Sequence, residues 1–508
     1  MKITFIEPPP LGKRVPERFA GCSFELYHFP DLANLYVLAV LHEAGYEVAY
    51  IDAILEKMDE RAFLRRIAED DSDYYVLHSV VSSKPADLYY LDRIRVVRPH
   101  AQVIVHGPEP TRVPEEYLRQ RPPRMNRGLM NPPPTDIRPS SVGVGLPSKV
   151  LTFQRSNVLV FRGEIEDNIL AYLRNGGLYG VSRWEDERIV YYPPSGRPVD
   201  LDMLPFIPRH HKALEPYVRS YFNPKFTRRP YTIMMASRGC AFHCLFCVPN
   251  SIGFARELEH KRYGGSKPGP QIASAERVIE EFRRIKAEGF QSVMVVDDQF
   301  LWGTPRTLRI CAGIADLNLE WGCLSRADFL TDKEVIKALA RAGCVSVDIG
   351  VESLDQVVLD DIQKDMKVET VYEAVRLLQS HGIHPKLNIM IGTSPKESAQ
   401  SIRTMVKQIQ AMDVENVMFS IATPFKGTAF YERCKAEGYL WEDSEAVDPL
   451  GRSLVYYPHL SAKQLEKLIR QSYRSFYLRP RWILRRLDTS LRSKSLWRDL
   501  HLALRLLR

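Results

Sequence analysis

Long apolar runs are missing from this chain of 508 residues. No segment approaches the roughly 20 uninterrupted apolar residues that a membrane-spanning helix needs. The opening stretch MKITFIEPPP also lacks the apolar core and cleavage site of a secretory signal. Cysteine is scarce: the chain has eight, and five of them are scattered singly. Because that count does not make a disulfide scaffold, we expect a soluble protein in the reducing cytoplasm.

An even distribution of charge is missing as well. The formal net charge is +8, yet the segment from Arg470 to Arg508 holds eleven Arg or Lys against two Asp, so the preceding chain sums to about −1. A basic tail can contact nucleic acid, an acidic partner or an anionic membrane surface. After Pro480, apolar residues recur every three or four positions between arginines. The pattern is typical of an interfacial helix, and a helix packed on the protein core fits it equally.

Residues 1–177 predict an α/β domain with a doubly wound parallel sheet. Apolar strand-like runs at 2–8, 74–80 and 101–107 alternate with helical stretches. Ligands of such sheets bind beyond the carboxyl ends of the strands. Those ends here are Pro8–Pro10, Ser79–Ser83 and Gly107–Pro108, although the same residues also suit ordinary turns.

The stretch from about 108 to 150 interrupts this pattern. It holds ten prolines between 108 and 147, and proline lacks an amide hydrogen and fixes φ. We therefore expect an inserted loop. Regular structure is expected again over 157–177, followed by a linker over 178–230 with a short strand at 188–193.

Residues 231–440 predict a run of strand–helix units. Strands are expected at 231–237, 292–298, 319–325, 345–351, 386–392 and 416–422, and helices at 273–289, 304–317, 331–343, 368–382 and 398–412. Six such units indicate a barrel or partial barrel, whose chemistry lies at the carboxyl ends of the strands. Residues 441–508 are expected to form a basic helical tail that begins with a capping box at Ser461 and Gln464.

Three cysteines lie within eight positions of the segment ASRGCAFHCLFCVPN, directly after the first of these strands: Cys240, Cys244 and Cys247. A structural zinc site needs a fourth ligand, and His243 is the only local candidate. Thiolates at this spacing suit an iron–sulfur cluster. Three thiolates on a four-iron cluster leave one iron open to a small molecule.

This CxxxCxxC segment resembles the signature of the radical S-adenosylmethionine (SAM) enzymes, which usually have an aromatic residue before the last cysteine, as Phe246 is here. The resemblance implies a partial (β/α)6 barrel, a [4Fe-4S] cluster on the three cysteines, and SAM chelated by the open iron. It implies one-electron cleavage of SAM to a 5′-deoxyadenosyl radical, which abstracts hydrogen from an unactivated carbon. An external electron donor of flavodoxin or ferredoxin type is implied with it.

Further segments resemble the SAM-binding strand ends of the same enzymes: VVDDQF (295–300), CLSRADFL (323–330), GVES (350–353), IMIGTSPKES (389–398) and ATPFKGT (422–428). The resemblance nominates Asp297 and Asp298 near the methionine amino group and Arg326 at the carboxylate. It nominates Glu352 near the ribose or amino group and Gly392 near the adenine. Each acid taken alone would be a solvated or helix-capping carboxylate, but their shared place at strand ends favours the binding role.

Residues 1–170 resemble the cobalamin-binding domain that accompanies this barrel in some radical SAM enzymes. The segments that carry the likeness are AGYEV with Asp52 after the next strand, VIVHGPEPTRVPEEYL (103–118) and FRGEIEDNIL (161–170). The resemblance implies cobalamin contacts at Ser79, Ser82, Gly107, Gly163 and Glu164. The DxHxxG motif that supplies a histidine to cobalt elsewhere is absent, and many radical SAM members bind cobalamin without it.

Together the resemblances imply methyl transfer to an unactivated carbon, with a second SAM regenerating methylcobalamin. The tail favours a hydrophobic substrate, such as a lipid, an isoprenoid (as for hopanoid methylases) or a tetrapyrrole, and peripheral contact with the inner membrane surface. One alternative is cyclisation or C–C bond formation without methyl transfer. Another is a nucleic-acid-modifying protein that grips RNA with its tail, although no RNA-binding module is recognised and we expect no nucleic acid. A non-catalytic cobalamin sensor is disfavoured by the cysteine triad.

Overall fold

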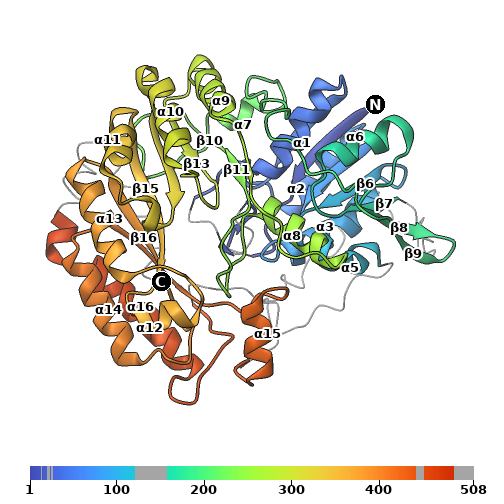
Figure 1. Ribbon diagram of the computed structural model, residues 1–508. Coiled ribbons are helices and arrows are strands. Elements are labelled where there is room, and N and C mark those ends of the chain that lie inside the picture. The colour runs from blue at the N-terminus through green and yellow to red at the C-terminus, as the bar shows by residue number, and fades with distance from the viewer. Residues whose placement is uncertain (13, 20–22, 25–26, 120–156, 442–450, 485–508) are drawn as a thin grey trace.

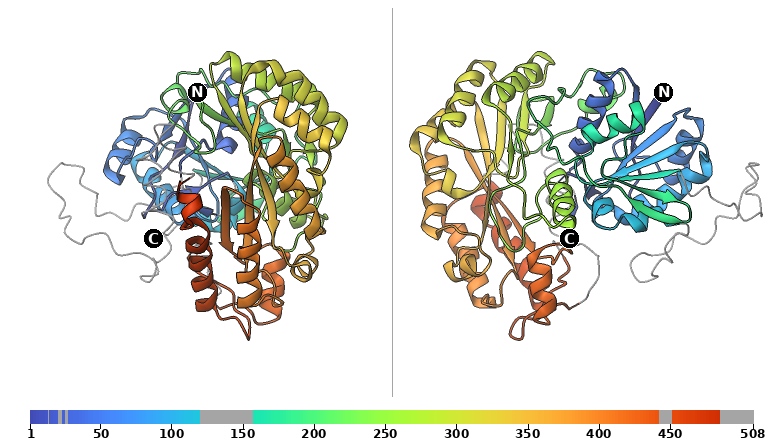
Figure 2. Two further views of the ribbon diagram at one scale, coloured as in Figure 1. Left: turned by 90° about the vertical axis from the view of Figure 1, so that its left-hand side faces the viewer. Right: turned by 45° about the vertical axis from the view of Figure 1, so that its right-hand side comes forward.

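Two β-sheets organise the chain (Figure 1). The computed structural model describes residues 1–508 except 13, 20–22, 25–26, 120–156, 442–450 and 485–508. A seven-stranded sheet lies in the N-terminal part and a six-stranded sheet in the C-terminal part. Figure 2 shows the two lobes side by side, with the C-terminal lobe carrying its helices on the outside.

The N-terminal sheet has the strand order β4-β1-β5-β6-β7-β8-β9, and its first five strands are parallel. Their bounds are Lys2–Glu7 (β1), Glu47–Asp52 (β4), Tyr74–His78 (β5), Gln102–His106 (β6) and Val158–Phe161 (β7). The helices are Leu32–Glu43 (α1), Glu60–Glu69 (α2), Lys84–Val97 (α3) and Glu166–Asn175 (α6). Helices α1 and α6 pack together, as do α2 and α3. This is a doubly wound order, which confirms the predicted fold class.

Two expectations for this part need correction. Residues 108–118, expected to be loop, form short helices, Pro108–Arg112 (α4) and Pro114–Leu118 (α5). Proline is tolerated there because it occupies the first helical turn, where the amide has no partner. The strands Val181–Glu185 (β8) and Arg188–Tyr191 (β9) form a hairpin that extends the sheet from β7, so part of the expected linker belongs to the first sheet. The remaining proline-rich stretch, 120–156, lies outside the described residues.

Helix α1 is buried all round from Leu32 to Leu41. Its apolar sequence LANLYVLAVL has no polar face, and such a helix needs partners on every side. The core that contains α1 continues into the C-terminal sheet, and the Tyr36 hydroxyl donates to the carbonyl of Met235 at 3.3 Å. The opposite face of the N-terminal sheet has a separate core under α2, α3 and α5.

The C-terminal sheet is parallel and follows chain order, β10-β13-β14-β15-β16-β17. The strands are Tyr231–Met234 (β10), Ser292–Val295 (β13), Glu320–Ser325 (β14), Cys344–Glu352 (β15), His384–Ile391 (β16) and Asn416–Ile421 (β17). The five expected helices are Ala275–Ala287 (α9), Thr304–Ile314 (α10), Lys333–Arg341 (α11), Val368–Ser380 (α13) and Ala399–Ala411 (α14). All six predicted strands and five helices are confirmed, in the order of a partial (β/α)6 barrel.

The remaining elements of the described fold are Pro16–Glu17 (β2), Ser23–Phe24 (β3), Glu215–Val218 (α7), Ser237–Arg238 (β11), Ser251–Arg262 (α8), Gln271–Ile272 (β12), Ala315–Leu317 (η1), Ala327–Phe329 (η2), Gln356–Asp361 (α12), Ala429–Ala436 (α15) and Ala462–Tyr477 (α16). Helix α16 begins with the predicted capping box of Ser461 and Gln464. No helix among the described residues is long and apolar enough to cross a membrane. The tail beyond residue 484 lies outside the description.

Tyrosine hydroxyl groups of α16 form hydrogen bonds with the backbone of the outer strand β17. The Tyr473 hydroxyl accepts from the Phe419 amide at 3.2 Å and donates to the Phe419 carbonyl at 2.8 Å. The Tyr477 hydroxyl likewise accepts from the Val417 amide at 3.0 Å and donates to the Val417 carbonyl at 2.7 Å. These contacts satisfy backbone groups that an outer strand otherwise leaves unpaired.

Substituting Tyr473→Phe is therefore expected to lower the free energy of unfolding by about 1–3 kcal/mol, because a buried amide and carbonyl lose their partner. Urea unfolding of the purified chain measures the change. Tyr372→Phe, on an exposed part of α13, is the matched control and should stay within about 0.5 kcal/mol of wild type. Equal stability of the two variants would contradict this role of Tyr473.

Candidate active site

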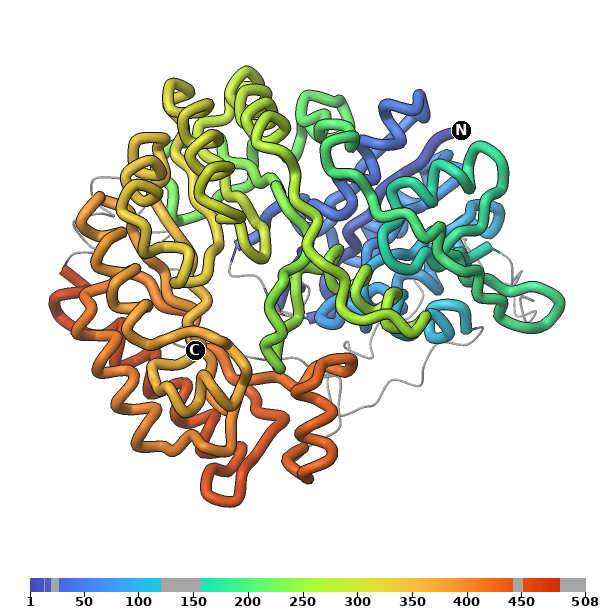
Figure 3. The backbone as a smooth tube through the Cα atoms, in the orientation of Figure 1, coloured from blue at the N-terminus to red at the C-terminus, as the bar shows by residue number. Residues whose placement is uncertain are grey.

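The cysteine loop (residues 239–249) connects β11 to α8, at the carboxyl end of the first barrel strand. Figure 3 shows this stretch of chain, in yellow-green, running between the two lobes. Cys240, Cys244 and Cys247 are free thiols, each half-buried. Burial raises the pKa of the Cys240 thiol and raises that of Cys247 further, with the neighbouring Cys244 adding to the shift on Cys247. A metal must therefore displace protons from these thiols when it binds.

Backbone contacts hold the middle of this loop. The Leu245 amide donates to the Ile362 carbonyl at 3.1 Å, and the Leu245 carbonyl accepts from the Phe430 amide at 2.9 Å. The Lys267 ammonium donates to the Phe242 carbonyl at 2.6 Å. The loop is thus tied to segments that follow other strands of the barrel.

The two acids after β13 anchor the same region. Asp297 accepts from the Ala236 amide at 2.6 Å and from the Ser237 hydroxyl at 2.8 Å. Asp298 accepts from the Gly239 amide and from both nitrogens of Asn250. Burial raises the pKa of Asp297 to about 7 and that of Asp298 to about 6. Both predicted SAM contacts therefore lie at the site, but their oxygens bind the chain itself.

Arg326 lies under the cysteine loop. Its guanidinium carbon is 3.6 Å from the centroid of the Phe242 ring. The guanidinium pairs with Asp328 at 2.9 Å and donates to the carbonyls of Lys364 and Asp365, each at 2.7 Å. Arg326 thus contacts the loop through Phe242, and its possible contact with the SAM carboxylate stays a prediction.

Glu352 ends β15 with φ at +66°, a conformation that a non-glycine residue adopts at a cost. The register of β15 against β16 shifts between Gly350 and Glu352, and such an irregularity re-aims side chains. The Glu352 carboxylate pairs with Lys364 at 3.1 Å. The Lys364 ammonium is also 5.9 Å from the Phe246 ring centroid. Glu352 and Phe246 are therefore brought together by a lysine that sequence reasoning missed.

Gly392 follows β16 with φ at +77°, where glycine is favoured. Its amide donates to the Glu397 carboxyl and its carbonyl accepts from the Tyr457 hydroxyl at 2.8 Å. Its place at the strand end is as predicted, while its contact with adenine stays a prediction.

The Glu397 carboxyl gives a pH-dependent prediction. Burial raises its pKa to about 8 from an ordinary value of 4.5. Between those values the unfolded chain releases this proton while the folded chain keeps it, so stability falls as the pH rises. We expect wild type to lose about 2–4 kcal/mol more than Glu397→Gln between pH 5 and pH 8 in urea unfolding. Parallel pH profiles of the two proteins would contradict this expectation.

The three thiols are not gathered as tightly as the ligands of one bound zinc ion. Four ligands at about 2.3 Å from a zinc ion bring sulfur atoms to within about 3.8 Å of one another. Among the described residues, the only three ligand atoms that all lie within 4.8 Å of one another belong to Glu7, His28 and Asp52. At least one pair of the three Sγ atoms is therefore more than 4.8 Å apart. His243, the candidate fourth ligand, is exposed.

The carboxyl edge of the N-terminal sheet holds a buried polar network. The Ser79 hydroxyl donates to Asp87 at 2.6 Å and contacts the Tyr117 hydroxyl at 2.7 Å, and Arg18 pairs with Asp87 at 2.8 Å. A Cβ on Gly107 would lie 2.6 Å from the His78 ring, so glycine is needed there for packing. Of the predicted cobalamin contacts at this point, Ser79 and Gly107 therefore have structural roles of their own.

Among the described residues, the buried polar atoms at this edge that have no hydrogen-bond partner include His78 Nε2 and Ser82 Oγ. The other ring nitrogen of His78 lies 2.8 Å from the Asp31 carboxylate. Buried polar atoms are nearly always paired, so each unpaired atom calls for an explanation. A ligand with polar groups above the strand ends is one such explanation, and it includes the predicted residue Ser82.

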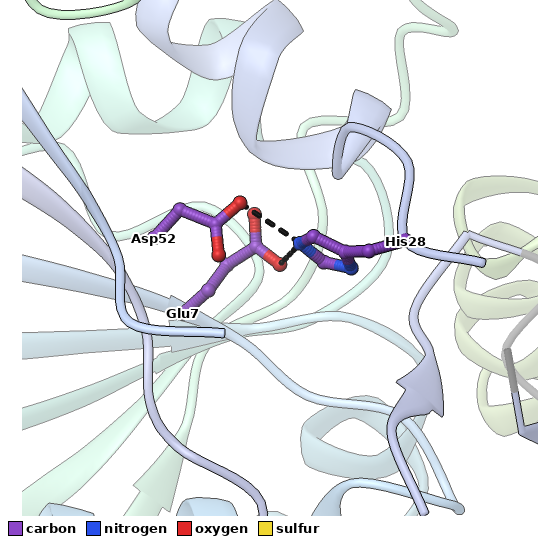
Figure 4. Close-up of side chains that lie close together, drawn as sticks. All are labelled: Glu7, His28 and Asp52. Carbon is purple, nitrogen blue, oxygen red and sulfur yellow. Dashed lines mark hydrogen bonds and ion pairs between the residues drawn. The ribbon is translucent and has the colours of Figure 1, made fainter. Parts of the chain in front are cut away.

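A separate cluster lies at the ends of β1 and β4, where Glu7 and Asp52 occupy paired positions (Figure 4). The Nε2 atom of His28 faces both carboxylates, 2.8 Å from Asp52 and 3.8 Å from Glu7. Tyr221 donates to Asp52 at 2.8 Å, and Tyr50 donates to Glu7. Burial, with the Asp52 charge beside it, raises the pKa of Glu7 well above its usual range. These hydrogen bonds account for the cluster without a metal ion.

Ion pairs join the two lobes next to the cysteines. Arg238, two residues before Cys240, is fully buried and pairs with Glu164 at 2.9 Å and with Glu166. Arg162 pairs with Glu259 of α8 at 3.0 Å. The predicted cobalamin contact Glu164 is thus part of the junction between the lobes.

Gly163 has a role at the same junction. A Cβ at this position would lie 3.2 Å from the Glu259 Cβ, so glycine allows α8 to approach. Together these contacts place the carboxyl edge of the N-terminal sheet against the cysteine loop and α8.

Residues 234–409 match the family model described as the radical SAM superfamily. The chain therefore contains a radical SAM domain, and its homologues indicate an enzyme. That domain implies a [4Fe-4S] cluster and SAM, and the cysteine loop at the first strand end is the segment suited to hold them. Radical SAM enzymes in general use small-molecule substrates and an external electron donor.

Relatives narrow the class further. A Pyrococcus horikoshii protein described as an uncharacterized methyltransferase is 26% identical over 493 residues, 96% of this chain and 94% of that protein. The cytidylyl-2-hydroxyethylphosphonate methyltransferase of Streptomyces wedmorensis is 24% identical over 255 residues, 47% of this chain and 45% of that one. The radical SAM methyltransferase TsrM of Kitasatospora setae, solved with cobalamin and a [4Fe-4S] cluster, has the same fold. Its TM-score is 0.61 at 15% identity, over 92% of this chain and 84% of TsrM. The chain is thus a homologue of radical SAM methyltransferases.

Proposed function

We propose that this chain is a cobalamin-dependent radical SAM C-methyltransferase. One observation carries the proposal: the carboxyl edge of the N-terminal doubly wound sheet lies against the cysteine loop of the barrel. Arg238 joins the two through Glu164 and Glu166. A cofactor on that edge would lie beside the cluster, as methyl transfer within one site requires.

The residues at both edges fit the proposed cofactors. Cys240, Cys244 and Cys247 supply soft thiolates, the ligands that hold iron–sulfur clusters. His78 and Ser82 present unpaired polar atoms where cobalamin is proposed. When bound, the cluster supplies one electron to SAM and cobalamin supplies the methyl group.

The protein's own share of the reaction is to orient the reactants. Lys364 is a buried cation beside Glu352 and Phe246, a suitable partner for a carboxylate. Phe242, Phe329 and Trp302 form an aromatic cluster with ring centroids about 6.1 and 6.2 Å apart. That cluster lies beside the cysteine loop, where it reduces access of water to the reacting atoms.

For the substrate we propose a hydrophobic molecule, a lipid, isoprenoid or tetrapyrrole-like compound. Support comes from Leu478, Ile483 and Leu484, which are exposed just after α16, within the basic segment that begins at Arg470. A peripheral contact with an anionic membrane would bring such a substrate to the enzyme. Sedimentation of the full chain with anionic liposomes, competed by RNA, tests this contact. Retention by liposomes supports it, and preferential binding to RNA with a steep salt dependence contradicts it.

Anaerobic reconstitution with iron, sulfide and hydroxocobalamin tests the methyltransferase proposal. The protein should retain corrinoid through gel filtration. With a reductant and substrate candidates, SAM should yield 5′-deoxyadenosine and S-adenosylhomocysteine together. Deoxyadenosine formed without S-adenosylhomocysteine, by protein that retains no corrinoid, would contradict methyl transfer and favour cyclisation or C–C bond formation.

A further inference from the structure

Asp298 closes the cysteine loop at both of its ends. One carboxylate oxygen accepts from the Asn250 amide at 2.7 Å. The other accepts from the Gly239 amide at 3.2 Å and from the Asn250 side-chain amide at 3.0 Å. Gly239 immediately precedes Cys240, and Asn250 follows Cys247 by three residues. A single buried carboxylate therefore joins the two ends of the segment that carries all three thiols.

We propose that Asp298 is a positioning residue that holds the three thiols at the distances from one another that a [4Fe-4S] cluster requires. This inference rests on one part of the proposed function, the binding of that cluster by the three thiols. A carboxylate has about four acceptor sites, and three of them are used by the loop. Its main role is therefore to support the cysteine loop, in place of the contact with the SAM amino group that its strand-end position predicts.

The surroundings of Asp298 explain why one residue can do this. Strands β10 and β13 are parallel neighbours, with Met234 opposite Val295, so the chain that leaves β13 starts beside the chain that leaves β10. Asp297 fixes the earlier residues Ala236 and Ser237. Asp298 then fixes the loop proper. The Asn250 side chain adds a second link, because its carbonyl oxygen caps α8 through the Gly253 amide at 2.9 Å.

A loop without this link can still fold but holds its thiols less firmly. Asp298→Asn keeps the shape and replaces one acceptor oxygen by a donor that faces other donors. Outer-shell partners of metal ligands typically change metal affinity by about 10- to 100-fold when they are removed. We expect the chelator concentration that removes half of the iron to fall by about that factor.

The experiment compares anaerobically reconstituted full-length proteins. Iron content, chelator resistance and the EPR spectrum of the reduced cluster, with and without SAM, are measured for wild type, Asp298→Asn and Asn250→Ser. Serine at 250 can still cap α8 but lacks the second link, so we expect an intermediate loss. Glu281→Gln removes another buried acid, one paired with Arg209 away from the loop, and serves as the matched control.

The outcomes separate this inference from the proposed function. A broadened EPR spectrum and easier iron loss in Asp298→Asn, with an unchanged circular dichroism spectrum and an unaffected control, support the positioning role. If Asp298→Asn resists the chelator as well as wild type and gives the same EPR spectrum, the positioning role is overturned and the proposed function stays intact. A wild-type protein that binds no iron would overturn both.

Discussion

Replacing Cys244 by serine is expected to abolish cluster binding and to reduce SAM cleavage to the level of a protein-free control. The loop offers three thiols, and the cluster already has one iron without a protein ligand. Losing one of the three leaves two thiolates and a second iron without a protein ligand, and a serine hydroxyl does not ionise near neutral pH to replace the lost thiolate. Iron and sulfide analysis after anaerobic reconstitution measures the first effect. Chromatographic quantification of 5′-deoxyadenosine measures the second.

The control for this variant is Cys311→Ala. Cys311 is buried in α10, apart from the cysteine loop. The Cys311→Ala variant should have a somewhat lower free energy of unfolding than wild type. Its iron content and its rate of SAM cleavage should stay at wild-type levels. Undiminished deoxyadenosine formation by Cys244→Ser would show that the thiols do not hold the catalytic cluster.

The largest effect on stability is expected for Arg238→Met. The substitution keeps much of the volume but leaves Glu166 buried without its cation, and leaves Glu164 with only the more distant Arg256, at 3.6 Å. Breaking a buried ion pair in this way typically costs about 3–5 kcal/mol. Because Arg238 immediately precedes the cysteine loop and ties it to the N-terminal lobe, we also expect faster cluster loss in air. Denaturant unfolding and the decay of cluster absorbance measure the two effects.

A matched triple variant tests the cause. Arg238→Met combined with Glu164→Gln and Glu166→Gln removes the charges as a set, and neutral replacement of a buried ionic group is often well tolerated. It should recover most of the lost stability. A triple variant as unstable as Arg238→Met alone would assign the loss to packing against Tyr36, over which Arg238 lies at 5.5 Å.

The strands and helices of the barrel could be predicted because each is a local pattern. Apolar strands, helices with capping residues and glycine stops recur in order, and all six strands form as expected. Helix α8 was missed, because it is buried on most sides and lacks a clear apolar stripe. Strand β9 lies within the short strand expected at 188–193, but its partner β8 was missed because this half-exposed strand carries few apolar residues.

The site shows the same division between local and distant information. The cysteines are predictable because their spacing alone indicates the chemistry. The strand-end acids Asp297 and Asp298 are correctly placed, yet sequence position does not tell whether a carboxylate points at a ligand or at a neighbouring loop. Arg238, Glu166 and Lys364 act through partners that are distant in sequence, and no spacing rule connects them.

The most direct test of the central claim is the EPR spectrum of the dithionite-reduced, anaerobically reconstituted wild-type chain, recorded without SAM and with SAM labelled with ¹⁷O in its carboxylate. The account predicts a [4Fe-4S]⁺ signal whose g-values shift when SAM is added and which shows hyperfine coupling to the label. An EPR signal that does not change when SAM is added, or a protein that takes up zinc and no iron, would contradict the claim that the three thiols hold a SAM-binding cluster.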